Sequence, residues 1–348
     1  ENFIVDIDEK MEKDLLKSFE YRRKLREDLL THPDVREKIR PRQDEMKAWE
    51  SLLSTAEEEL FSGGVCAVDG SISSYPMASG TRCRIGVVAT SYKNNRLEKI
   101  LYVSEREFAE PAATPYEHFD KLLKSRRISK MLLRAVMLHA ERQLALKRPE
   151  KWKLVHGELL PYELRTGLGV YRALDECLGL GQKLIEAKNI FAIVEDTSRI
   201  DLQNAGDILR AGEYMRVTDL KDDLRLYLYG DDEKGLSGAH FNRDDEEKFQ
   251  WFIDSFGENI EVGIFRVGYK PYLIHAHKEV FDHAVAIVMQ DSKNQPMRGF
   301  PLLIDYADNI CHGLLSEGEF QKKIMFKTAK ISPDTLGFET VARMTRRR

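Results

Sequence analysis

Apolar and polar residues follow a helical spacing through the first sixty residues of the chain. In residues 3–30, apolar side chains recur every three or four positions among many charged ones, which predicts an amphipathic helix. The segment His32-Pro33-Asp34 interrupts this helix. A second helix is predicted to run toward Leu60, with a kink or restart at Pro41. Residues 1–60 are therefore expected to form a helical arm that is more polar than a core layer.

The pattern changes at residue 65 to short apolar runs that are typical of buried strands. Three such runs come in succession, and a turn at Lys93-Asn94-Asn95 indicates that the last two form a hairpin. Amphipathic helices then alternate with further apolar runs. The predicted strands cover residues 65–69, 82–92, 97–103, 152–158 and 190–194, and the predicted helices cover residues 116–146 and 168–187.

This order of elements, β-β-β-α-β-α-β, predicts an α/β protein with a mixed sheet. A three-strand meander followed by two right-handed helical crossovers is the layout of the ribonuclease-H-like fold. In that fold the first and fourth strands are neighbours, so residues at their ends meet at one edge of the sheet. The order of the strands thus predicts which distant residues share a site.

Beyond residue 196 the periodicity is weaker and predicts helical and hairpin additions to this core. We expect helices at residues 200–211, 249–256, 278–289 and 302–315, a short strand at 224–229, and a hairpin of 263–269 with 271–275. Residues 331–348 lack a long apolar face and end in three arginines. The predicted organisation is an arm over residues 1–60, a main domain over 61–330 and a mobile basic tail over 331–348.

Composition places the chain among ordinary folded proteins. It has 348 residues, of which 42% are hydrophobic and 32% charged, enough to bury a substantial core. No apolar run reaches the roughly 18 residues that a membrane span needs. The four cysteines show none of the paired spacing of a zinc site, so buried reduced thiols and a cytoplasmic location are expected. The net charge of −4 indicates no overall basic surface of the kind that coats DNA.

Three acidic residues follow predicted strands and form the candidate site. Asp69 ends the first strand, Glu158 ends the fourth, and Asp196 follows the fifth directly after Glu195. Carboxylate oxygens suit Mg²⁺ or Mn²⁺, and two-metal phosphodiester hydrolysis needs several of them at one point. An Asp-Gly pair alone is more often a surface turn, but three carboxylates at one sheet edge favour a metal site.

Four segments resemble the motifs of a known family, the NurA nucleases. Val68-Asp69-Gly70-Ser71 looks like the first motif, and His156-Gly157-Glu158-Leu159-Leu160 is similar to the second. Residues 193–199 resemble a Val-Lys-Asp-Ser-Arg-like segment, and residues 298–308 resemble the segment where a Gly-x-Pro turn opens a helix. The resemblance extends from about residue 67 to residue 310.

The resemblance implies a ribonuclease-H-like core with a helical N-terminal extension and a Mn²⁺-dependent (or Mg²⁺-dependent) DNA nuclease. It implies metal binding by Asp69, Glu158 and Asp196, with Ser71 and Arg199 touching the phosphate. It also implies a homodimer that works with a hexameric HerA-like ATPase, in DNA repair or phage defence. Digestion polarity and strand preference stay open.

Two departures from the family pattern leave alternatives open. Glu195 stands where the family often has Lys, and Asp308 stands where it often has His. A catalytically weak adaptor that docks onto an ATPase ring is therefore the second hypothesis. A third, a kinase of actin-like topology, is disfavoured because the chain has no Gly-x-x-x-x-Gly-Lys-Ser/Thr phosphate loop. The histidines that could replace the lost one in space are His275, His277, His283 and His312.

Overall fold

The described strands of this computed structural model form one mixed sheet of nine, in the order β1-β7-β8-β9-β6-β5-β2-β3-β4. The structure describes residues 7–75, 81–93, 98–104, 126–165, 173–195, 202, 205–229, 243–315 and 317–331. The strands are β1 (Ile39–Arg40), β2 (Val65–Tyr75), β3 (Arg82–Thr90), β4 (Glu98–Ser104), β5 (Trp152–His156), β6 (Ile190–Val194), β7 (Tyr214–Asp219), β8 (Ile260–Arg266) and β9 (Pro271–His277).

Half of this sheet has the predicted ribonuclease-H-like topology. Strands β2, β3 and β4 form an antiparallel meander, with Asp69 opposite Val88. Strand β5 then lies parallel to β2, with Val68 opposite Val155, and β6 lies parallel to β5. The α/β fold class expected from the order of elements is therefore confirmed, and β2 and β5 lie side by side as that fold requires.

The sheet continues beyond β6 through strands that the sequence pattern located only in part. Strand β9 is antiparallel to β6, and β8, β7 and β1 follow it. The hairpin of β8 and β9 was predicted, although β8 begins three residues earlier than expected. Strands β7 and β1 were missed, because β1 has only two residues and the six residues of β7 form neither an apolar run nor a strict alternation.

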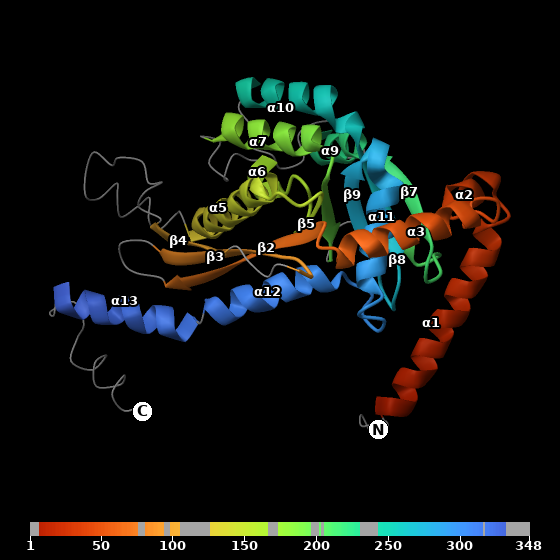
Figure 1. The fold of residues 1–348 in the computed structure, drawn as a ribbon, viewed down its shortest axis with the longest axis horizontal. Helices are drawn as coiled ribbons and strands as arrows, with labels where there is room; N and C mark the ends of the chain where they lie inside the picture. The colour runs from red at the N-terminus through yellow and green to blue at the C-terminus, as the bar shows by residue number, and fades with distance from the viewer. Residues whose placement is uncertain are drawn as a thin grey trace, which may run out of the picture.

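Helices cover both faces of the sheet, as Figure 1 shows. On one face, α5, α7, α9 and α10 share a core cluster with β2, β3 and β5, and on the other α3, α11 and α12 share a second cluster with the sheet. The helices are α1 (Ile7–Leu29), α2 (Pro33–Lys38), α3 (Met46–Phe61), α5 (Arg126–Lys147), α6 (Tyr162–Arg165), α7 (Leu174–Ala187), α9 (Leu220–Tyr229), α10 (Arg243–Phe256), α11 (Phe281–Ser292), α12 (Leu302–Leu314) and α13 (Glu317–Ile331).

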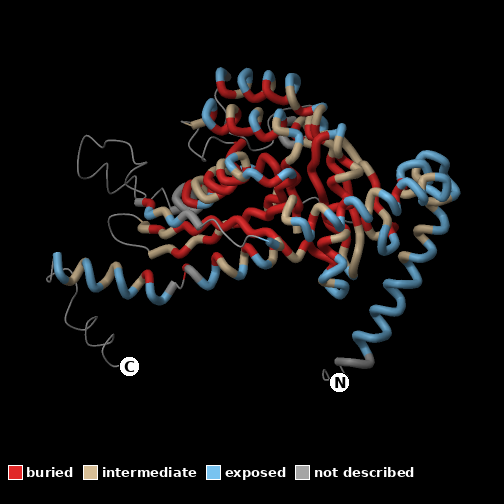
Figure 2. Tube along the Cα trace, in the orientation of Figure 1, coloured by how far each residue is buried: buried red, intermediate tan, exposed pale blue. Residues whose placement is uncertain are grey.

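The predicted polar arm is helical, but its second half packs into the core. Trp49, Ala56 and Leu60 of α3 are buried against α11 and the sheet. Helix α1 projects from the body with most of its surface exposed (Figure 2). The expected strand at residues 224–229 is wrong, since these residues lie in α9, whose apolar side packs on the sheet.

Other expectations concern the cysteines, membrane spans and the tail. Cys66, Cys83, Cys177 and Cys311 are buried free thiols, as predicted. None of the described helices has the length and apolar composition of a membrane span. The predicted tail lies outside the described residues except for Ile331, the last residue of α13.

A buried polar network fixes α12 against the sheet and against α11. Asp291 of α11 is fully buried and accepts hydrogen bonds from the Tyr92 hydroxyl at 2.6 Å and from the Leu303 backbone N–H at 2.9 Å. Thr90, the last residue of β3, donates to the Leu303 carbonyl at 3.0 Å. The bond from Leu303 N–H satisfies one of the free backbone donors at the beginning of α12, and together these contacts set the position of the helix over β2 and β3.

This network predicts an unusual dependence of stability on pH. Burial raises the pKa of Asp291 to about 6, above that of the unfolded chain, so the native state binds this proton more tightly. The contribution of Asp291 to the free energy of unfolding should therefore fall as pH rises from 4 through 6. Relative to Asp291→Asn, wild type should lose up to about 3 kcal/mol between pH 4 and pH 7. Urea denaturation of both proteins across this range measures it, and a constant difference would contradict it.

Candidate active site

Asp69 lies in the middle of β2 at the point where the buried half of the strand ends. Its side chain is 4% exposed, and its Oδ1 accepts a hydrogen bond from the Gly70 backbone N–H at 2.8 Å. Its Oδ2 has no hydrogen-bond partner among the described residues. A buried carboxylate oxygen without a hydrogen-bond donor is costly, so this oxygen can accept a further positive group.

Glu141 of α5 lies near Asp69, on the face of the sheet that α5 and α7 cover. It is 1% exposed, and its Oε2 pairs with the guanidinium of Arg142, while Oε1 has no hydrogen-bond partner among the described residues. Burial raises the pKa of Glu141, and the charge of Asp69 adds to this rise, whereas the charge of Arg142 opposes it. A Cβ atom at Gly70 would lie 2.6 Å from Oε1, so only glycine after Asp69 lets Glu141 come this close to the strand.

His156, the last residue of β5, lies between two carboxylates. Its Nδ1 is 3.4 Å from Asp69 Oδ2, without the geometry of a hydrogen bond, and its Nε2 is 3.8 Å from Glu195 Oε2. Burial would lower the pKa of His156, but Asp69, Glu141 and Glu195 outweigh it, and the net shift is upward. A protonated His156 can therefore bridge Asp69 and Glu195.

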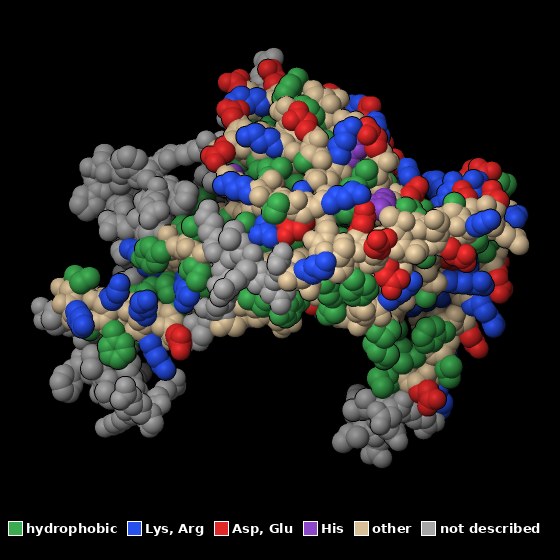
Figure 3. All heavy atoms as spheres, in the orientation of Figure 1, with side chains coloured by type: hydrophobic (Ala, Val, Ile, Leu, Met, Phe, Trp, Pro, Cys, Tyr) green, Lys and Arg blue, Asp and Glu red, His purple; other side chains and the backbone are tan. Residues whose placement is uncertain are grey.

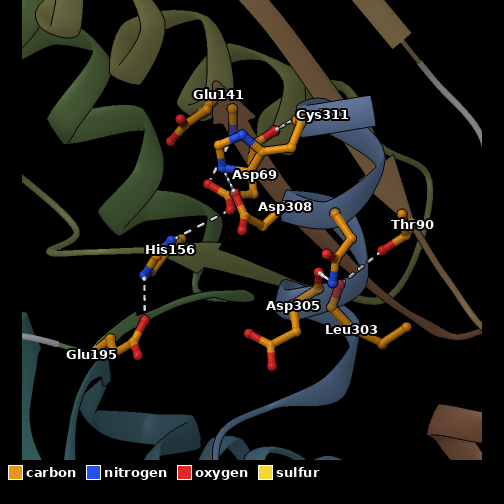
Figure 4. A network of polar contacts seen from close by, with 12 residues as sticks. Asp69, Thr90, Glu141, His156, Glu195, Leu303, Asp305, Asp308 and Cys311 are labelled. Atoms are coloured by element: carbon orange, nitrogen blue, oxygen red, sulfur yellow. Dashed lines mark hydrogen bonds and ion pairs between the residues drawn. The ribbon is translucent and has the colours of Figure 1, made fainter. Parts of the chain in front are cut away.

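Helix α12 adds two further carboxylates on the opposite side of β2. Figure 4 shows Asp308 beside Asp69, with Asp305 one turn earlier on the helix. Burial and then the charge of Asp69 raise the pKa of Asp308. Cys311, one turn later, donates its thiol proton to the Asp69 carbonyl at 3.4 Å. Asp69 is thus held between α5, β5 and α12.

An arginine connects the outer carboxylates of this site. Arg298 contacts Glu195 and Asp305 with its two terminal nitrogens and stacks on the ring of Phe300, whose centroid is 4.8 Å from the guanidinium carbon. This arrangement explains how two carboxylates that the sequence placed more than a hundred residues apart can lie near one another. Arg298 therefore neutralises the carboxylates at the rim of the site, but it contacts neither Asp69 nor Glu141.

The five predicted site residues do not all lie at the site in the structure. Asp69 is at the centre, and Ser71 lies two residues farther along β2, on the same face of the strand. Glu158 follows β5, but its carboxylate contacts Arg165 of α6. Asp196 and Arg199 lie outside the described residues. Convergence of Asp69, Glu158 and Asp196 on one metal remains a prediction.

Glu141 and His156 were not among the predicted site residues, although the position of Glu141 in the sequence carries a signal. Glu141 falls on the stripe of α5 that Leu133, Met137 and Leu144 make apolar, and a charged residue in such a stripe is either paired or functional. Glu195 and Asp308 appeared as departures from a family pattern, yet both contribute to the charge around His156.

The carboxylates around Asp69 are candidate ligands for a divalent metal ion. Within the described residues, no three His, Cys, Asp or Glu side chains converge closely enough to hold a metal ion by themselves. The free, buried oxygens of Asp69 and Glu141 nevertheless fit a hard cation, which favours carboxylate oxygen and would offset the repulsion that raises the pKa of Glu141. These two residues would hold the ion, with Asp308 beside them.

Comparison with known proteins gives structural but no sequence matches. No protein-family model and no curated protein sequence matches the chain. A structure of the NurA nuclease from Sulfolobus solfataricus has 10% sequence identity, a TM-score of 0.47, and coverage of 82% of this chain and 94% of that one.

Two further structures have similar coverage. A NurA structure with manganese has 12% identity and a TM-score of 0.41, over 82% of this chain and 98% of that one. An endonuclease V from Bacillus subtilis has 11% identity and a TM-score of 0.35, over 82% and 95%. These three solved structures, to which the chain is similar, are nucleases of the NurA and endonuclease V kinds.

Proposed function

We propose that this protein is a divalent-metal-dependent DNA nuclease that hydrolyses phosphodiester bonds at Asp69. The observation that carries the proposal is the pair of buried carboxylates, Asp69 and Glu141, each with one unpartnered oxygen, in the middle of a ribonuclease-H-like sheet. The resemblance of the segments around Asp69 and His156 to nuclease motifs supports the same activity.

Each described residue has a chemical task under this proposal. Asp69 and Glu141 would hold Mn²⁺ or Mg²⁺, and such an ion would supply Lewis-acid chemistry for phosphodiester hydrolysis. Arg142 holds Glu141 in place through its buried ion pair. His156, when protonated, balances the charge of Asp69 and Glu195 and can donate a proton toward an oxygen of the substrate.

The remaining residues and partners of the proposal come from the sequence. Asp196 and Glu158 are proposed to complete the metal site, while Ser71 and Arg199 contact the phosphate. The homodimer and the HerA-like hexameric ATPase are proposed on the resemblance alone. Helix α1 offers a surface for such partners, because Met11, Leu16 and Phe19 are all exposed on it.

The metal can be tested apart from activity. Mn²⁺ that binds the native state should raise the free energy of unfolding, by roughly 2.7 kcal/mol at a hundred times its dissociation constant. We expect a rise in melting temperature with Mn²⁺ that EDTA reverses and that Glu141→Gln weakens. Wild type whose melting temperature does not respond to Mn²⁺ or Mg²⁺ would remove the metal from the proposal.

Cleavage distinguishes the nuclease from the second hypothesis, the catalytically weak adaptor. Purified protein is incubated with linear DNA in Mn²⁺, in Mg²⁺ and in EDTA. The nuclease predicts shortening of the DNA in the presence of metal only. Intact DNA under all three conditions, from protein that binds Mn²⁺, would favour the adaptor.

A further inference from the structure

Helix α13 has an exposed face that carries four lysines. Its exposed residues recur with helical spacing. They are Glu319, Lys322, Lys323, Phe326, Lys327 and Lys330, together with Ile331 at the end. The opposite side packs toward the body, where Phe320 is 6% exposed. We call the four lysines and Phe326 the lysine face.

The charge of this face is not neutralised within the described part of the chain. None of its four lysines forms an ion pair or hydrogen bond with a described residue, whereas many other lysines, such as Lys188 and Lys221, do. Figure 3 shows these basic side chains gathered over α13. In a chain of net charge −4, four lysines on one face that have no partner among the described residues indicate an anionic partner.

Phe326 adds a second property to the lysine face. Its side chain is 62% exposed and lies between Lys323 and Lys327, where it covers no core. An exposed aromatic ring among basic side chains is the arrangement on which unpaired nucleic-acid bases stack while the phosphates contact lysine. A purely electrostatic surface would not require an aromatic residue at this position.

The lysine face is connected directly to the candidate active site. Helix α12, which carries Asp305 and Asp308, leads into α13, and both helices lie against β2 (Figure 1). From Asp69 to the end of β2 at Tyr75 is on the order of 20 Å at the usual rise of a strand. This length corresponds to about six nucleotides at 3.4 Å per base step.

We propose that the lysine face of α13 binds a single-stranded DNA segment and guides it along β2 to Asp69. The proposal rests on the proposed nuclease function and adds the substrate surface and the strand type to it. The lysines contact successive phosphates, and Phe326 stacks on a base. Duplex DNA can use the lysines but not the ring, because its bases are already stacked.

The test replaces all four lysines by glutamine in the full chain. The ligand is labelled oligothymidylate of about 20 nucleotides, which is longer than the usual site of a single-strand-binding domain. Binding is measured by fluorescence anisotropy in EDTA, so that metal-dependent cleavage does not occur. We expect roughly tenfold weaker binding or more at moderate salt, and a slope of log K against log salt that is smaller by about 3. Phe326→Ala should weaken single-strand binding about fivefold or more and leave duplex binding unchanged.

A matched control carries the same change of charge elsewhere. Lys47, Lys183, Lys278 and Lys293 are exposed and scattered over other elements. Their fourfold glutamine variant should bind oligothymidylate nearly as wild type does. Equal losses in both variants would mean that total charge, and not the lysine face, governs binding, and would overturn the proposal.

A small phosphodiester separates this proposal from the nuclease itself. Hydrolysis of bis(p-nitrophenyl) phosphate with Mn²⁺ should be unchanged in the α13 variant, because this substrate does not reach the lysine face. If wild type shows no hydrolytic activity but binds DNA through the lysines, the proposed nuclease function is contradicted and the proposed DNA-binding surface stands. Lysine-dependent binding of anionic vesicles by a wild type that ignores DNA would identify a lipid partner and overturn the proposal.

Discussion

Replacing Asp69 by asparagine should reduce Mn²⁺-dependent cleavage of linear DNA by at least about 100-fold, which corresponds to roughly 2.7 kcal/mol or more of transition-state stabilisation. Asparagine keeps the size of the side chain and an oxygen that can accept from the Gly70 N–H. It removes the negative charge that a divalent cation needs at the centre of the site. Initial rates on end-labelled DNA measure the effect.

The same substitution should leave the fold intact. Asp69 lies near Glu141 and Asp308, and its charge contributes to the raised pKa of both. Repulsion among these carboxylates therefore destabilises the folded state when no metal is bound. The melting temperature of Asp69→Asn without metal should therefore equal or slightly exceed that of wild type. Asp254→Asn, at an exposed carboxylate paired with Arg225, is the control that should cleave normally. Undiminished cleavage by Asp69→Asn would remove this residue from the mechanism.

Replacing Arg142 by methionine should cause the largest loss of stability, about 3–5 kcal/mol, as expected when one partner of a buried ion pair is removed. Arg142 is fully buried, pairs with Glu141, and donates to the backbone carbonyls of His156 and Glu158. Methionine fills much of the volume but leaves one charge and two carbonyls without this donor. Urea denaturation at neutral pH measures the change.

Two controls identify the cause of that loss. Arg225→Met breaks the exposed contact with Asp254 and should cost no more than about 1 kcal/mol. Adding Glu141→Gln to Arg142→Met should recover part of the stability, because it removes the uncompensated carboxylate. A double variant no more stable than Arg142→Met would show that the carbonyl contacts, and not the ion pair, account for the effect.

The parts of the fold that follow from local pattern were predictable. Apolar runs of strand length gave β2 to β6, and their order gave the neighbouring positions of β2 and β5 and hence the importance of Asp69. Strands β1 and β7 were not predictable in this way. Ile39 and Arg40 become a strand only by pairing with Met215 and Tyr214, nearly 180 residues away. Such pairing depends on tertiary structure and leaves no periodicity.

The site was predictable only where a side chain lies on a strand or directly after one, and the expected end of the first strand at Asp69 is wrong, because β2 continues to Tyr75. Asp69 belongs to a strand and was identified, whereas Glu141 is on a helix whose apolar stripe conceals it. Glu158 follows its strand as expected, yet the turn at Gly157, with a φ of 79°, and Arg165 determine what its carboxylate contacts. The direction of a side chain after a strand depends on that turn, which the pattern of apolar residues does not encode.

The central position of β2 has a consequence for hydrogen exchange. Strand β2 is paired with β3 along its length, with Asp69 opposite Val88, and with β5 up to Val68, the residue before Asp69. Amides in the middle of such a sheet exchange mainly through global unfolding. Amides of α1, which projects into solvent, should exchange by local fraying instead. The backbone that carries Asp69 is therefore expected to be in place before any ion or DNA strand arrives.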